Sequence, residues 1–303
     1  AEEWGISDTQ FDWSTGAYEQ VFTVHPEWRG SVIADLNFEL PALAHGTRAR
    51  IRSTYEYVPF LEEFLKDLPT LTRAYPEETR VTAPIETWSD DFSIAISGIP
   101  SMVDDFTGGS FMQTNYHSQF DNDGYYDEDV YRMHHELFGL LLMAIDKTAV
   151  VPLSFAGVMK KAEECISDEW CEKCGADRDG FMKALRKAAK AGDKAYEKVL
   201  EANREYARYR AALQNDAGEE NPAAKADALY ENNRNLEKAL LRAFQKVQDT
   251  FVRIDWHGMV LFPQEILQEH LTLLDGAIGN LKEGKISAAL RKLYEIDNNS
   301  YAF

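Results

Sequence analysis

The chain has 303 residues, of which 45% are hydrophobic and 27% charged, a composition typical of a folded globular protein and not of a disordered one. The length suffices for a sizeable core and for two domains. A formal net charge of -19 disfavours nucleic acid and anionic membranes as partners, because their phosphate groups would be repelled. The longest apolar run, Leu137 to Ile145, is about half of the roughly 20 residues that a membrane-spanning helix needs, so no such segment is expected.

The negative charge is concentrated in the first half of the chain. Residues 1–150 contain 9 basic and 26 acidic residues, whereas residues 151–303 contain 23 and 25. This asymmetry predicts two domains, residues 1–152 and 153–303. The first ten residues lack the basic start and apolar stretch of a signal peptide, so none is expected, and the compartment, extracytoplasmic or cytoplasmic, stays open.

The first half alternates strand-like and helical segments. Ser31 to Leu40 and Phe92 to Pro100 have the apolar, β-branched character of buried strands, and the alternating basic segment Gly46 to Ser53 is typical of an edge strand. Tyr55 to Leu68 and Asp127 to Ala149 carry apolar residues at helical spacing. Strands that alternate with helices predict an α/β fold with a mainly parallel sheet and flanking helices.

The second half has a different pattern. Asp179 to Asn215, Asn221 to Ile254 and Pro263 to Leu293 are rich in Ala, Leu, Glu, Lys and Arg and contain few β-branched residues, which predicts three long helices. We therefore expect an all-α helical bundle domain to follow the α/β domain.

Residues that could bind a metal lie in three separate places. Glu2 and Glu3 are adjacent, Asp35 is predicted at the carboxyl end of a strand, and Tyr116 and His117 precede a helix. Groups at the carboxyl ends of strands in an open α/β sheet converge on one crevice, and carboxylates with an imidazole are typical zinc ligands. The alternatives are solvated glutamates, a strand-end turn or cap, and a structural histidine.

Four motifs in this order resemble those of the zinc-dependent exopeptidases of the aminopeptidase, glutamate carboxypeptidase and transferrin-receptor-like family. The segments are "AEEWG", "IADLNFE", "SDDFSIAISGIP" and "NYHSQFDN", and the resemblance covers the chain from Ala1 to about Phe155. It implies a partial phosphorylase/hydrolase-like α/β fold and a hydrolase, a di-zinc metallopeptidase, that cleaves peptide bonds with a metal-activated water.

The resemblance also implies roles for single residues. Glu2 would be the general base, and Tyr116 would donate a hydrogen bond to the oxyanion of the tetrahedral intermediate. Glu3 and His117 would ligate one zinc ion and Asp35 the other. Such a division is physically reasonable, because two metal ions activate a bridging water while a carboxylate that binds no metal moves its proton.

Further ligands and supporting residues follow from the same resemblance. Asp90 or Asp91 would orient His117 from the second layer of the site. The family's bridging aspartate and its remaining zinc histidine come from segments upstream of the glutamate pair, and neither segment is in this sequence. We therefore expect the chain to be a truncated, C-terminal part of such a peptidase that is inactive alone, with a separate N-terminal segment as a candidate partner.

The substrate class and the rival function are also predicted. Asp104 and Asp105 form either an acidic rim, which favours peptides with a free α-amino group and hence an aminopeptidase, or a solvated turn. The rival function is a non-catalytic, peptidase-fold interaction protein like the transferrin receptor ectodomain. The resemblance further implies a homodimer formed through the helical domain.

The three cysteines, Cys165, Cys171 and Cys174, lie in one short stretch. No second pair and no nearby histidine completes a zinc site, so we expect reduced thiols or one local disulfide. His134 and His135 precede the apolar run and are expected to cap or pack in a helix.

Overall fold

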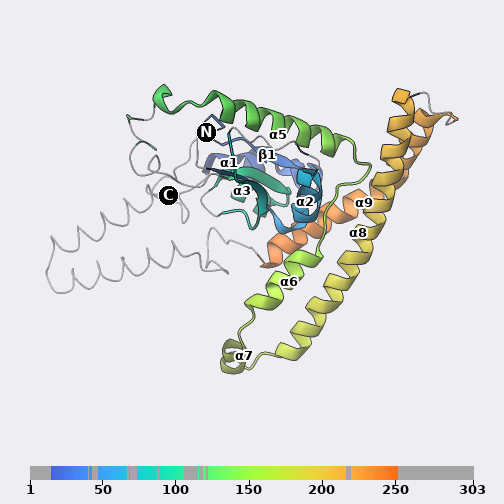
Figure 1. Ribbon diagram of the computed structural model, residues 1–303. Helices are drawn as coiled ribbons and strands as arrows, with labels where there is room; N and C mark the ends of the chain where they lie inside the picture. The colour runs from blue at the N-terminus through green and yellow to red at the C-terminus, as the bar shows by residue number, and fades with distance from the viewer. Residues whose placement is uncertain are drawn as a thin grey trace.

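The structure is a computed structural model (Figure 1). It describes residues 15–39, 41–42, 47–66, 68, 74–86, 89–105, 115, 119–120, 122–215 and 220–251. Over these ranges the protein is mixed α/β and 67% helical, with helices around a four-stranded sheet. The predicted α/β class is therefore confirmed.

The sheet is mostly parallel. Its strands are β1 (Asp35–Asn37), β2 (Arg48–Ser53), β3 (Glu78–Thr82) and β4 (Ser101–Asp105), in the order β1-β4-β2-β3. β1 runs parallel to β4 and β2 parallel to β3, and an antiparallel pairing of β2 with β4 joins the two pairs. The prediction of an edge strand at Gly46 to Ser53 is wrong, because β2 lies between β4 and β3 and buries Ala49 and Ile51.

Helices make up most of the remaining structure. They are α1 (Thr15–Glu19), the π-helical turn η1 (Gln20–Val24), the 3-10 turns η2 (Pro26–Trp28), η3 (Tyr55–Tyr57) and η4 (Asp123–Tyr125), α2 (Val58–Lys66), α3 (Asp90–Ser97), α5 (Glu128–Asp146), α6 (Ala156–Cys165), α7 (Asp168–Cys174), α8 (Arg178–Asn215) and α9 (Pro222–Phe251). Helices α2, α5, α8 and α9 occupy segments that the sequence predicted to be helical. The predicted helix Pro263 to Leu293 lies outside the described residues.

The predicted strand at Phe92 to Pro100 is wrong, because this segment forms α3 and the loop that follows it. Asp90 and Asp91 lie in the first turn of α3, where acidic side chains interact favourably with the helix dipole and stabilise the helix. Gly98 ends the helix with φ +107°, a left-handed conformation suited to glycine, and its N–H donates to Ala95 and Ile94 carbonyls. The helix is buried on most sides, so its sequence lacks the polar face that marks a surface helix.

The strand predicted at Ser31 to Leu40 is much shorter than expected. Only Asp35–Asn37 pair with β4, in the register Asp35 with Ser101, so Asp35 begins the strand instead of ending it. The predicted position of Asp35 at the carboxyl end of its strand is therefore wrong. Asn37 occupies that end.

The two faces of the sheet are covered by different helices. Neighbouring residues of a strand point to opposite faces. Met102 packs in a large core with Ile51, α2 and α5, whereas Val103 packs in a small cluster with Phe92 and Ile96 of α3. Figure 1 shows α5 lying along the sheet.

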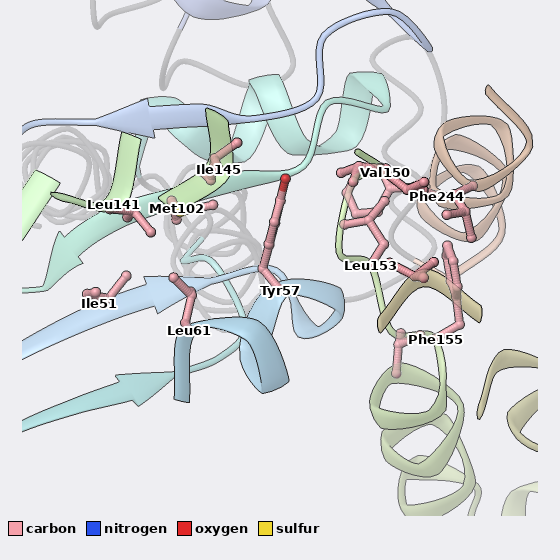
Figure 2. Close-up of a cluster of buried hydrophobic side chains, with 14 of the residues drawn as sticks. Ile51, Tyr57, Leu61, Met102, Leu141, Ile145, Val150, Leu153, Phe155 and Phe244 are labelled. Carbon is pink, nitrogen blue, oxygen red and sulfur yellow. The ribbon is translucent and has the colours of Figure 1, made fainter. Parts of the chain in front are cut away.

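The large core continues from the sheet to the long helices. Figure 2 shows Leu153, Phe155 and Phe244 of the helical side in the same cluster as Ile51 and Met102. The Asn203 side chain of α8 accepts hydrogen bonds from the N–H groups of Ala149 and Val150, both at 2.9 Å. Division into domains at residues 152 and 153 stays a prediction.

Candidate functional site

Three of the predicted site residues lie within the described residues, on two elements. Asp35 lies in β1, and Asp90 and Asp91 lie in the first turn of α3. The other four predicted site residues lie outside the described residues; they are Glu2, Glu3, Tyr116 and His117. Their predicted roles stay predictions.

The structure brings Asp35 and Asp91 together; we call them the carboxylate pair. Asp35 and Asn37 share one face of β1, because they are two residues apart in a strand. From this face the Asn37 amide Nδ2 donates to Asp91 Oδ1 at 3.2 Å. The Ser89 hydroxyl donates to the same oxygen. The two predicted residues, 56 positions apart in the sequence, therefore lie near each other where α3 contacts β1, and the charge of Asp91 acts on Asp35.

Both carboxyl groups of the pair are withdrawn from water and incompletely bonded. Asp91 has an exposed fraction of 0%, and Asp35 is half-buried. In each residue the Oδ2 atom is buried and has no hydrogen-bond partner within the described part of the chain. A buried polar atom without a partner is costly, and such atoms in native structures often mark functional sites.

The environment raises the pKa of both acids. Burial raises the pKa of Asp35 to about 7, and the negative charge of Asp91 adds to this effect, while a hydrogen bond from Ser101 opposes it. Burial also raises the pKa of Asp91 to about 6, and the hydrogen bonds from Ser89 and Asn37 oppose the rise. Two close carboxyl groups disfavour each other's ionised form, and a bound cation would reverse that penalty.

The donor set of the carboxylate pair fits a metal ion in part. Carboxylate oxygens are ligands for zinc and for harder divalent cations. Among the residues that the structure describes, no group of three or more His, Cys, Asp or Glu side chains could hold a metal ion. The pair therefore supplies two ligand atoms, and the further ligands predicted by the sequence, Glu3 and His117, lie outside the described residues.

A second buried acid lies on the opposite face of the sheet, against α5. Asp104 is 2% exposed, so the predictions of an exposed acidic rim or a solvated turn are both wrong for this residue. Its Oδ1 accepts the backbone N–H of Glu39 at 2.7 Å, and its Oδ2 lies 3.6 Å from His134 Nε2. The substrate preference inferred from Asp104 therefore loses its structural basis.

His134 is a buried residue whose position the sequence did not reveal. Its Nδ1 lies 2.7 Å from the Pro41 carbonyl oxygen, which can only accept, so Nδ1 carries a proton. Burial lowers the pKa of His134, and the hydrogen bond to Pro41 opposes this. The sequence predicted that both His134 and His135 cap or pack in a helix, and His134 does pack in α5, but no local pattern indicates that a carboxyl group faces it.

Glu56 is a further buried acid that sequence reasoning missed. It is fully buried, and neither carboxyl oxygen has a hydrogen-bond partner among the residues described. Burial raises its pKa to about 8. The only sequence signal is a single glutamate flanked by Tyr55 and Tyr57 before an apolar helix.

The three cysteines, Cys165, Cys171 and Cys174, are free thiols, in agreement with one of the two predicted states.

No helix within the described ranges is long and apolar enough to cross a membrane.

Comparisons of the chain with protein-family models, with curated proteins and with solved structures found no match. Function is therefore inferred from the residues and their geometry.

Proposed function

We propose that the chain carries part of the active site of a zinc-dependent exopeptidase of the aminopeptidase and glutamate carboxypeptidase family. The observation that supports this function best is the carboxylate pair. Asp35, the strand residue of the second family motif, is held beside Asp91, a residue of the third motif, and each has a buried oxygen without a partner in the described structure. A cation between these motifs would relieve their mutual repulsion.

In this proposal Asp35 Oδ2 ligates one zinc ion, and Glu3 and His117 ligate the other. Two zinc ions would polarise the scissile carbonyl and activate a water molecule. Glu2 would take the proton from that water and return it to the leaving amine, and Tyr116 would donate its hydroxyl hydrogen to the oxyanion. The family resemblance places its remaining zinc ligands upstream of the glutamate pair.

The finer fold assignments belong to the same proposal. The mostly parallel sheet would be part of a phosphorylase/hydrolase-like domain, and α6 to α9 would form the helical bundle domain. α8 and α9 contact each other where α8 ends and α9 begins (Figure 1), as neighbouring helices of a bundle do, and the far end of α9 contacts α3. The proposed substrate is a peptide. Asp104 is buried and does not contact the substrate in this proposal.

Zinc titration by isothermal calorimetry tests this function. The intact protein should bind zinc, and Glu3→Ala, His117→Ala and Asp35→Asn should each weaken that binding by about 100-fold, as loss of a ligand or of its direct support does. Lys173→Gln is a matched surface control and should leave the affinity unchanged. Zinc binding that none of the three substitutions alters would overturn the proposal.

The second candidate is a non-catalytic interaction protein of the same ancestry. The observation that favours it is a run of exposed apolar side chains on the outer surface of α5: Leu140, Leu142 and Met143 are 41%, 59% and 53% exposed. This candidate predicts no zinc binding at the carboxylate pair. A homodimer is compatible with either function, and sedimentation equilibrium of the full chain would measure it.

A further inference from the structure

Asp91 is held in one orientation by two hydrogen bonds to the same oxygen. Ser89 and Asn37 both donate to Asp91 Oδ1, and they come from the residue before α3 and from the end of β1. Oδ2 of the same carboxyl group accepts no hydrogen bond from any described residue, although the side chain is fully buried. Carboxylate ligands of metals are commonly held by hydrogen bonds to the oxygen that does not bind the metal, and Asp91 has such hydrogen bonds at Oδ1.

Asp91 lies near Asp35, because its negative charge raises the pKa of Asp35. The two residues lie on contacting elements, and the Asn37 side chain, on the same face of β1 as Asp35, reaches Asp91. Asp35 Oδ2 likewise has no hydrogen-bond partner among the described residues. Two neighbouring buried acids cannot both ionise without a cost, and either a proton or a bound cation between them removes that cost.

We propose that Asp91 is itself a ligand, through Oδ2, of the metal ion that Asp35 binds, and not a residue that orients His117. This inference rests on the proposed zinc site. It supplies a second ligand to an ion for which the family resemblance leaves only Asp35 in this chain. A zinc ion that performs catalysis normally has three protein ligands, so a second carboxylate brings the site closer to a working set.

Asp90 provides the matched control because it is the neighbouring acid in the same turn of α3. Asp91 accepts a hydrogen bond from Asn37 of β1, whereas the charge of Asp90 raises the pKa of Asp35 less than that of Asp91 does. Asp90 is only half-buried. A general loss of negative charge near the site would follow from either substitution, whereas loss of a ligand would follow from Asp91→Asn alone.

The test is competition for zinc between a chromophoric chelator and the intact wild-type, Asp35→Asn, Asp91→Asn and Asp90→Asn proteins. Wild-type protein should bind zinc, Asp35→Asn and Asp91→Asn should each weaken binding by about 100-fold, and Asp90→Asn by less than about threefold. Far-UV circular dichroism would show that each protein is folded. Ser89→Ala is a second variant that keeps both carboxyl groups and removes one support of Asp91, and it should weaken zinc binding by about tenfold.

Two results would overturn the inference, and they differ in what they mean for the function. If Asp35→Asn weakens zinc binding and Asp91→Asn does not, Asp91 is no ligand, and the proposed zinc site stands without it. If neither substitution changes zinc binding, or the wild-type protein binds none, the carboxylate pair is an acid pair that shares a proton, and the proposed function fails with the inference.

Discussion

The two faces of the sheet bury acids in opposite ways. Against α5, Asp104 lies beside the His134 imidazole and accepts a backbone N–H from Glu39, so the chain itself provides partners for the acid. Against α3, Asp35 lies near a second acid, Asp91, whose negative charge raises the pKa of Asp35. A carboxyl group beside an imidazole can be neutralised within the protein, whereas two carboxyl groups cannot both ionise without help.

This difference separates a structural site from a candidate functional one. Both faces are buried and both contain acids, so burial alone does not distinguish them. The two faces differ in whether removal of one member of the pair lowers or raises the free energy of unfolding. The following predictions use that criterion, from the largest expected effect to the smallest.

The largest effect is expected at the imidazole face. His134→Ala should lower the free energy of unfolding by about 4 kcal/mol, because it leaves Asp104 beside a cavity and the Pro41 carbonyl without its donor. Urea denaturation at pH 7 would measure this loss. His135→Ala, one position further on the exposed side of α5, should cost less than about 1 kcal/mol. Equal losses would show that the His134–Asp104 contact contributes nothing specific.

Glu56 is a third buried acid, and its raised pKa predicts a pH dependence of stability. Glu56 ionises near pH 4.5 in the unfolded chain and near pH 8 in the folded protein. Between these values the folded state binds more protons, so the free energy of unfolding falls as pH rises and levels off above about pH 8. The loss from pH 5 to 9 should be about 4 kcal/mol, at about 1.4 kcal/mol for each unit of pKa.

Glu56→Gln should remove most of the slope between pH 7 and 9, because the amide stays neutral at every pH, whereas Asp35 and Asp91, with pKa values of about 7 and 6, still contribute below pH 7. Urea denaturation at pH 5, 7 and 9 would measure it, with the exposed Glu63→Gln as the control that keeps the wild-type slope. A Glu56→Gln protein that keeps the full slope would mean that other groups cause it.

At the carboxylate pair, removal of one acid should raise the free energy of unfolding, in contrast to the loss expected for His134→Ala. In a chelator at pH 8, Asp35→Asn should raise the free energy of unfolding by about 1 kcal/mol, because it removes one of two repelling charges and offers an amide N–H to Asp91. Asp90→Asn should change stability by less than about 0.5 kcal/mol. Thermal unfolding of the three metal-free proteins would compare them, and a clear loss of stability in Asp35→Asn would contradict the account of this face.

The smallest effect is expected where α5 begins. The Asp127 side chain accepts the N–H groups of Asp129 and Val130, at 2.9 and 3.1 Å, and so caps the helix that covers the imidazole face. Asp127→Ala should cost about 1 kcal/mol. Asp129→Ala removes an acid from the same turn but no capping side chain, so it should cost less. A larger loss for Asp129→Ala than for Asp127→Ala in chemical denaturation would show that Asp127 does not stabilise the helix as a cap.

The long helices could be predicted because their signals are local. α5, α8 and α9 repeat apolar residues at helical spacing over at least 19 residues, and the structure confirms them. α3 could not be recognised in this way, because its eight residues are buried on most sides and resemble a buried strand. The short strand β1 and the interior place of β2 depend on pairing between distant segments, which no local pattern reports.

The site was predictable in its parts but not in its arrangement. The sequence singled out Asp35 and Asp91 separately, and the structure brings them together through Asn37 and Ser89. The two sequence-based expectations for Asp104, an acidic rim or a solvated turn, both placed it at the surface. Strand pairing with β2 buries Asp104 instead, and the packing of α5 adds His134 to it.

Anomalous diffraction from crystals of the protein grown with zinc would test the central claim most directly. The account predicts a zinc peak about 2.0 to 2.2 Å from Asp35 Oδ2, with Asp91 Oδ2 as a second ligand. Zinc found only at the thiols or at surface histidines, with the carboxylate pair metal-free, would contradict it.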